Sequence, residues 1–279
     1  MAALDLIHCK PIGRRVFGLI LAVVIVSACA EVPITGRSGL HLVPNAELAT
    51  MSLEQYRAVL GKSQLSTDAR QVAMVRLVGT RIAQAAEALL KETGARDAIA
   101  NYHWEFNLIQ DDKTVNAWVM PGGKAAVYTG ILPYTRNETG LAVVLGHEVA
   151  HALAGHGNER LSQGLLTQLG GTALSVALQS QPQLTQTLFM EAFGVGTSVG
   201  FLLPYSRLHE SEADRIGLTL MARAGYDPRE AIPFWQRMQA QEQSRPPEFL
   251  STHPAPETRI RDIQSYMAEA LPYYQKSNR

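Results

Sequence analysis

Apolar residues recur at helical spacing in two stretches in the first third of the chain. In residues 67–91 they repeat every three or four positions, and residues 46–60 also have a helical pattern and composition. Gly94 follows the second stretch, and a glycine commonly marks the end of a helix. We therefore predict helices over 46–60 and 67–91.

The pattern changes in the middle of the chain. Residues 103–109 alternate between polar and apolar side chains, which is typical of a strand with one buried face. Two further extended segments, 115–120 and 125–129, are separated by a proline and two glycines that indicate a turn. From about residue 137 onward the pattern is mostly helical. These elements predict an α+β protein, predominantly helical, with a small antiparallel sheet.

Residues 147–151 carry the strongest chemical signal and follow an apolar run of good helix formers, 141–146. On a helix, residues four apart lie about 40° apart around the axis. The imidazoles of His147 and His151 therefore share one face and can hold one Zn2+, while Glu148 lies beside that face and can take a proton from water at the metal. The alternative is a buried helix with two satisfied histidines. Burying these side chains without partners is costly, and a metal would satisfy them.

A zinc site needs a third protein ligand, whose position distinguishes the subclasses of protease. The metzincin pattern requires glycine at 154 and histidine at 157, but the chain has Ala154 and Gly157 there. His156 is one residue out of register and would lie about 140° from His151 on a continuous helix. We interpret His156 as a surface residue or a residue that supports a ligand. The other common third ligand is a glutamate from another helix.

Residues 208–214 contain such a glutamate. Glu210 and Asp214 are four residues apart and share a helix face, whereas Glu212 points roughly away from Glu210. Glu210 can bind the metal, and Asp214 can accept the outer N–H of a ligand histidine and fix its tautomer. The alternative for this segment is an acidic helix face in water.

Together these residues resemble the minigluzincin zinc metallopeptidases, the family of the HtpX heat-shock protease and the CAAX prenyl proteases, and more closely their soluble periplasmic lipoprotein branch. The resemblance lies in His-Glu-x-x-His at 147–151, Glu-x-Glu-Ala-Asp at 210–214, and segments 33–37, 116–123, 204–207 and 251–254. It implies a zincin-like domain in which the edge strand of the sheet borders the active-site helix. It also implies one Zn2+ per chain held by His147, His151 and Glu210, with Glu148 as the general base and Asp214 beside a ligand.

The predicted strand over 115–120 resembles the strand with which the family binds its substrates. Its candidate residues are Asn116, Ala117 and Trp118, whose backbone would pair with an extended peptide without reading its sequence. The alternative is an ordinary strand with Trp118 in the core. Both interpretations hold together if only one edge of the strand faces the cleft.

Three further residues are candidates for the site. His253 lies in a predicted loop bounded by Pro254, and is either a donor to the transition state, a fourth ligand that blocks water in a resting form, or a packing residue. Tyr205 and Arg207 could each stabilise the oxyanion that peptide hydrolysis requires.

Residues 162–203 are apolar and contain several glycines. Polar residues interrupt the run, so that no stretch reaches the roughly 18 apolar residues of a membrane span. The interruptions are Gln168, Gln179, Gln181, Gln183, Gln186 and Glu191. We predict a helical hairpin packed over the active site, as a lid or in contact with a bilayer surface. A last helix is predicted over 256–271.

The first residues have the pattern of a targeting segment. Three basic residues, Lys10, Arg14 and Arg15, precede an apolar core over 16–26 that is short for a membrane span. The small residues before Cys29 resemble a bacterial lipobox, in which the chain is cut before the cysteine and its thiol is lipidated. The alternatives are an ordinary signal peptide with an incidental cysteine and an uncleaved anchor.

The expected organisation is a signal peptide over 1–28, a lipidated tether over 29–45 and one metallopeptidase domain over 46–279. Ala30 rather than aspartate follows Cys29, so we expect attachment to the outer membrane on its periplasmic face. The mature chain would have no second cysteine for a disulfide. Its 22 basic and 24 acidic residues give a charge of −2, which argues against nucleic acid as a partner.

The expected function is that of a zinc metalloendopeptidase acting on unfolded or misassembled polypeptides of the cell envelope, in protein quality control. Outer-membrane proteins are candidate partners. The alternative is a chaperone-like protein that binds clients with little or gated proteolysis. A structural zinc protein is disfavoured, because such sites are closed and rich in cysteine.

Overall fold

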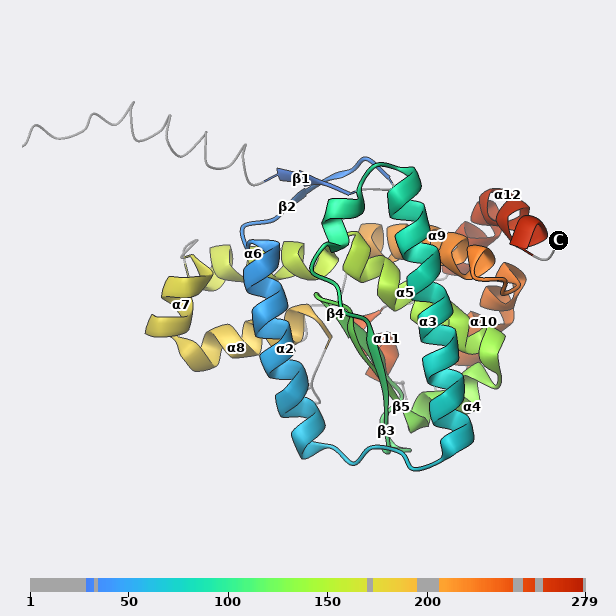
Figure 1. Ribbon diagram of the computed structural model, residues 1–279, viewed down its shortest axis with the longest axis horizontal. Coiled ribbons are helices and arrows are strands. Elements are labelled where there is room, and N and C mark those ends of the chain that lie inside the picture. Colours follow the sequence, from blue (N-terminus) through green and yellow to red (C-terminus); the bar gives the residue numbers. More distant parts are fainter. Residues whose placement is uncertain are drawn as a thin grey trace, which may run out of the picture.

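A three-stranded sheet stands between two groups of helices (Figure 1). Its strands β3 (Glu105–Ile109), β4 (Ala117–Met120) and β5 (Lys124–Tyr128) follow the order β3-β5-β4. β4 and β5 form the predicted antiparallel hairpin, and β3 adds a parallel pairing with β5. The parallel pair arises because the chain passes from β3 to the far edge before it turns back into the centre. β4 is therefore an edge strand, as expected.

The computed structural model describes residues 29–32, 35–169, 173–194, 206–242, 248–253 and 258–277. The predicted signal peptide and Tyr205 lie outside these residues. The α-helices are α2 (Asn45–Lys62), α3 (Ala69–Glu92), α4 (Leu132–Thr135), α5 (Glu138–Leu153), α6 (His156–Leu169), α7 (Leu174–Ser180), α8 (Pro182–Ala192), α9 (Arg207–Arg223), α10 (Ala231–Glu242), α11 (Glu248–Thr252) and α12 (Arg259–Ser277). The predicted α+β class, predominantly helical, is confirmed.

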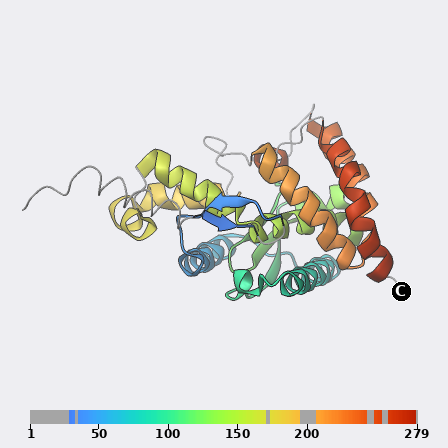
Figure 2. The same ribbon diagram turned by 90° about the horizontal axis from the view of Figure 1, so that it is seen from above.

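Each face of the sheet contributes to a separate hydrophobic core. Trp118 and Met120 face α2, α6 and α8, and pack with Leu48, Tyr56 and Leu161. The neighbouring residues of the same strands face α3, α5 and α9 in the larger core. Figures 1 and 2 show these two groups of helices on opposite sides of the sheet. Strand alternation produces this division, because successive side chains point to opposite faces.

The two predicted N-terminal helices are present as α2 and α3, with ends within two residues of the prediction. Asp68 caps the start of α3 by accepting hydrogen bonds from the N–H groups of Arg70 and Gln71. Gly94 follows the helix with a φ of 75°, which suits glycine at this position. The predicted C-terminal helix begins three residues later than expected and continues to Ser277.

The predicted helical hairpin corresponds to α6, α7 and α8, in which α6 and α8 pack together. These helices project to the left in Figure 1, away from α9 and α12. No described helix is both long enough and apolar enough to cross a membrane.

Residues 29–45, predicted as a tether, include a short hairpin. β1 (Cys29–Glu31) and β2 (Ser38–Leu40) pair antiparallel, and Val32 between them is buried. The hairpin lies along the top of the molecule in Figure 1, next to α6.

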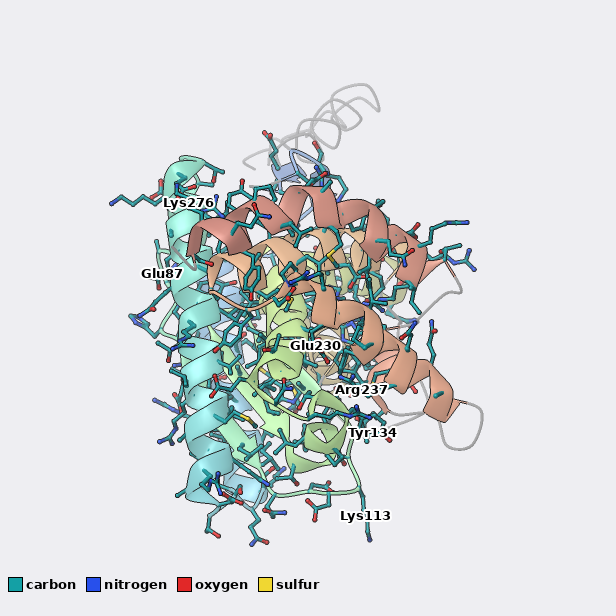
Figure 3. The ribbon with its side chains drawn as sticks, turned by 90° about the vertical axis from the view of Figure 1, so that its right-hand side faces the viewer. Glu87, Lys113, Tyr134, Glu230, Arg237 and Lys276 are labelled. Atoms are coloured by element: carbon teal, nitrogen blue, oxygen red, sulfur yellow. The ribbon has the colours of Figure 1, made fainter. Side chains whose placement is uncertain are left out.

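A side-chain hydrogen bond connects α10 to α4 at the face of the molecule shown in Figure 3. Arg237 of α10 donates a hydrogen bond to the backbone oxygen of Tyr134 (2.9 Å) and another to the carboxylate of Glu230 (2.8 Å). This fixes α10 against α4, and α10 carries Trp235, which lines the site described next.

Candidate metal centre

Two helices that cross closely build the centre. α5 begins at the N-cap Asn137, whose side chain accepts a hydrogen bond from the N–H of Gly140, and its residues from Gly140 to His151 are all buried. α9 crosses it with Gly217 against Gly146, and the two backbones touch there. Because neither glycine has a side chain at the crossing, the imidazoles of α5 can meet the carboxylates of α9.

The three predicted ligands come together in the structure. The Nε2 atoms of His147 and His151 lie 3.0 Å apart, and the carboxylate oxygens of Glu210 lie 3.4 Å from each. All three side chains are at least 97 % buried. Atoms bound about 2.0–2.1 Å from one tetrahedral zinc would be roughly 3.3 Å apart, so this donor set fits the metal.

The outer nitrogens of both histidines are also held. His147 Nδ1 lies 2.9 Å from Asp214 Oδ1, which brings Asp214 to the position predicted for it. His151 Nδ1 lies 2.8 Å from the Nδ1 of His156. Each ligand histidine therefore has one ring nitrogen bonded to the protein and the Nε2 directed at the common point, an arrangement that fixes ring orientation in metal sites.

Burial and neighbouring charges set the protonation of the three predicted ligands. Burial lowers the pKa of His147, but the charge of Glu210 and the hydrogen bond with Asp214 outweigh it and raise that pKa to about 9. Burial and the positive charge of His147 lower the pKa of His151 well below its ordinary value. Burial would raise the pKa of Glu210, yet His253, Arg259 and His147 hold it well below its usual range. The centre thus has an ionised carboxylate and a neutral imidazole ready for a cation.

Glu148 lies on the neighbouring face of α5, as its place in the motif predicts. Its carboxylate is buried, and burial raises its pKa. Within the described residues its Oε1 has no hydrogen-bond partner, although His253 Nε2 lies 3.3 Å away. A buried carboxylate oxygen without a donor is costly, and a water molecule at a metal beside it would supply one.

His253 enters the centre from the C-terminal part of the chain. Its Nδ1 lies 3.0 Å from Glu210 Oε1 and 3.2 Å from His147 Nε2. The residue follows α11 directly and its N–H is bonded to the carbonyl of Phe249, so Thr252 belongs to a helix and not to the predicted loop. His253 could serve as a fourth donor with His147, His151 and Glu210.

Arg259 is a residue of the centre that the sequence analysis missed. Its Nη1 lies 2.8 Å from Glu210 Oε2 and its Nη2 lies 2.7 Å from Asp214 Oδ1. The side chain is almost completely buried. It lies more than forty residues after Glu210 in the sequence, and no spacing rule connects the two positions.

The structure corrects the interpretation of His156. The helix of the motif does not continue through it: α5 ends at Leu153, Gly155 has a φ of 69°, and His156 begins α6. The turn brings His156 back under His151, where it is fully buried. The surface alternative is therefore wrong, and the geometry agrees with the other alternative, a residue that supports a ligand. Its Nε2 lies 2.9 Å from Glu212, which is bonded inside the protein and is not part of a solvated face. Gly155 was the available signal, since a glycine with positive φ commonly ends a helix.

The remaining candidates are distributed as follows. Ala117 and Trp118 lie in the edge strand β4, where Trp118 is in the core and meets the ring of Tyr56 edge-on. Asn116 is buried and donates a hydrogen bond to Glu248 of α11 (3.2 Å). Arg207 is the first residue of α9 and its side chain is exposed.

Comparison with known proteins gives a consistent result. The sequence model of "Peptidase family M48" matches residues 77–267. The mitochondrial metalloendopeptidase OMA1 of Schizosaccharomyces pombe is 39% identical over 184 residues, 65% of this chain and 52% of that protein. Human OMA1 is 32% identical over 270 residues, 93% of this chain and 50% of that protein. The beta-barrel assembly-enhancing protease of Escherichia coli is 32% identical over 186 residues, 63% of this chain and 37% of that protein. The chain thus spans about half the length of the OMA1 proteins that it matches, and less of the bacterial protease.

Proposed function

The chain belongs to peptidase family M48, and we propose that it is a zinc-dependent metalloendopeptidase binding one Zn2+ per chain. The observation that supports this most directly is the convergence of His147, His151 and Glu210 from two crossing helices. Glu148 stands beside them with one oxygen that accepts no hydrogen bond from the described residues. Two imidazoles and a carboxylate are the ligand set of a catalytic zinc site of the two-histidine, one-glutamate type.

In the proposed reaction the C–N bond of the peptide is broken and a C–O bond to water is formed. Zinc, when bound, acts as a Lewis acid that polarises the carbonyl and makes water more acidic. Glu148 takes a proton from the attacking water and delivers it to the nitrogen of the leaving amine. Burial raises the pKa of Glu148, which makes the carboxylate a stronger base. Asp214 and His156 hold the two ligand imidazoles in orientation.

The edge strand β4 is the proposed binding site for the peptide backbone. Among the strands that the structure describes it pairs with β5 on one side, and it packs against α5. An unpaired strand edge can bind an extended chain through main-chain hydrogen bonds. In this assignment Asn116 and Ala117 lie at the binding strand and Trp118 anchors it from the core.

We assign His253 the role of a fourth ligand that closes the centre in a resting form. It lies close to Glu210, His147 and Glu148 at once, on the side where Glu148 would meet a water molecule. A centre with four protein ligands has no position for water, as in structural zinc sites. Activity would then require movement of His253 with the end of α11. Tyr205 and Arg207 stay as candidates for the oxyanion donor.

The proposed substrates are unfolded or misassembled polypeptides of the bacterial envelope. Two observations support this: the lipobox-like residues before Cys29, and the similarity to an Escherichia coli protease named for β-barrel assembly. In this proposal residues 1–28 are a signal peptide, Cys29 carries the lipid on the periplasmic face of the outer membrane, and residues 46–279 form the peptidase domain.

Glu148→Gln tests the catalytic assignment, because glutamine has nearly the same shape but cannot take the proton. We expect the purified variant to bind zinc as the wild type does and to lose cleavage of an unfolded protein such as casein by at least about a hundredfold. Equal cleavage by both proteins would refute the assignment. If neither protein cleaves but both suppress client aggregation, the chaperone-like alternative replaces it.

A further inference from the structure

The segment that follows β1 is bonded to α6, the helix whose first residue, His156, contacts the predicted ligand His151. The N–H of Leu42 donates a hydrogen bond to Ser162 (2.9 Å), and Asn158 donates one to the backbone oxygen of Val43 (2.8 Å). A Cβ at Gly39 would lie 2.5 Å from the carboxylate of Glu159, so a side chain there would displace this carboxylate from β2. Residues 35–43 are therefore seated on α6 by several independent contacts.

Arg37 is the charged residue of this segment, and it joins two carboxylates from different helices. Its Nε lies 2.7 Å from Glu212 of α9, and its Nη1 lies 3.0 Å from Glu159 of α6. Its side chain is 20 % exposed, and the two carboxylates are more than 90 % buried. A planar guanidinium can bond two carboxylates at once, which an ammonium group cannot do with the same geometry.

Glu212 transmits this contact to a predicted zinc ligand. Its carboxylate is surrounded by donors from Thr35, Arg37 and His156, so both oxygens accept. Because Glu212 accepts from His156 Nε2, the neutral ring of His156 has its free lone pair on Nδ1. That atom lies 2.8 Å from His151 Nδ1 and accepts a hydrogen bond from its N–H group. The lone pair of His151 is then on Nε2, the atom that faces His147 and Glu210.

The pair of Glu159 and His209 completes the cluster around Arg37. Glu159 lies 3.2 Å from Nε2 of His209, and the rings of His156 and His209 are stacked with centres 4.4 Å apart. Arg37 thus restrains both carboxylates that position the two stacked imidazoles. Without it the two negative side chains would repel each other across the cluster.

We propose that Arg37 is a positioning residue of the metal centre, acting through Glu212 and His156 to hold His151 with its Nε2 lone pair toward the metal. Residues 35–43, which follow the predicted lipid anchor Cys29, then help to position a metal ligand. This inference rests on the proposed function only in taking the centre as a zinc site.

Zinc affinity of the full-length protein tests the proposal without any cleavage assay. The zinc dissociation constant is measured by competition with a chromophoric chelator, and the Co2+ form is recorded by visible absorption. We expect Arg37→Met to raise the dissociation constant by about tenfold or more, as loss of residues that orient metal ligands does, and to shift the Co2+ bands. Arg37→Lys should recover part of the affinity, because lysine keeps the charge but lacks the planar group that bonds two carboxylates at once.

A double-mutant cycle distinguishes positioning from a general structural role. If Arg37 acts through His156, then Arg37→Met in a His156→Phe background should change the zinc dissociation constant by no more than about twofold. Arg215→Met, which removes an exposed arginine of α9 paired with Glu269, is the matched control and should leave it unchanged. If Arg37→Met does not fold, Glu212→Gln tests the same connection, because an amide can donate to His156 and reverse the tautomer.

Two results would overturn the proposal. One is a zinc dissociation constant and a Co2+ spectrum of Arg37→Met equal to those of the wild type. The other is that Arg37→Met raises the zinc dissociation constant as much in the His156→Phe background as it does in the wild type. Failure of the wild type to cleave peptides would instead count against the proposed function, since zinc affinity is measured independently of cleavage.

Discussion

The guanidinium of Arg259 lies 3.4 Å from the centre of the Trp235 ring while its nitrogens contact the carboxylates of Glu210 and Asp214. The ring of Trp235 also meets His147 at an angle of 70° with centres 5.9 Å apart. The guanidinium is therefore held between the ring of Trp235 and the carboxylates of Glu210 and Asp214. It lies next to the predicted ligand His147. Arginine is suited to this place because its flat group can stack and form ion pairs together.

Removal of this guanidinium should destabilise the protein. In Arg259→Met the two carboxylates lose a buried partner, and we expect the free energy of unfolding to fall by about 3 kcal/mol. Urea denaturation of the metal-free protein measures this. Arg215→Met is the control, because its pair with Glu269 is about half exposed and should contribute less than about 1 kcal/mol. Equal losses in the two variants would contradict the role given to Arg259.

The crossing of α5 and α9 should not tolerate a side chain. A Cβ on Gly146 would lie 2.9 Å from the backbone oxygen of Gly217, and a Cβ on Gly217 would lie 3.0 Å from the backbone of Gly146. We expect Gly146→Ala to lower the free energy of unfolding by about 1–3 kcal/mol and to weaken zinc binding, since the helices must separate.

Gly61 provides the control for this prediction. It lies near the end of α2, and a Cβ there would meet nothing within 4 Å. Gly61→Ala should leave stability unchanged or raise it by about 0.5–1 kcal/mol, because alanine favours the helix. Thermal unfolding of the three proteins makes the comparison, and an unaffected Gly146→Ala variant would show that the crossing can relax.

Substitution of His253 should activate the enzyme if the residue closes the centre. His253→Ala leaves His147, His151 and Glu210 to hold the metal, and a position becomes available for water. We expect zinc content to stay the same and the cleavage rate of an unfolded protein to rise. A fall in kcat with unchanged zinc content would instead favour His253 as a donor to the transition state.

Zinc binding should depend on pH through His147. The negative charges of Glu210 and Asp214 raise the folded-state pKa of this residue to about 9. Its protonation therefore stabilises the metal-free protein fully below the unfolded pKa of about 6.5, and that contribution is lost as the pH rises through about 9. Since zinc requires the neutral imidazole, its affinity should increase with pH over the same interval.

Calorimetry in buffers of different ionisation enthalpy measures this coupling. At pH 7.5 we expect about one proton to be released for each zinc bound. Asp214→Asn removes one of the charges that raise the pKa of His147, so it should release fewer protons. Zinc binding without proton release in the wild type would show that His147 is already neutral.

The elements with local patterns were predictable. The first two helices were placed within two residues, and the edge position of β4 followed from the family resemblance. The break after α5 was not predicted, because the position of His156 was considered only for a continuous helix, although Gly155 was present. That single turn decides between the two alternatives for His156 and makes it the partner of His151.

The sequence by itself determined which residues can act together on one helix. His147 with His151, and Glu210 with Asp214, share faces because helical geometry repeats every 3.6 residues, and this needs no knowledge of the rest of the fold. The tertiary structure alone decided how those two faces meet, through the glycine crossing of α5 and α9. It also decided that Arg37, His253 and Arg259 surround them, since contacts between residues separated by more than forty positions depend on packing and not on local periodicity.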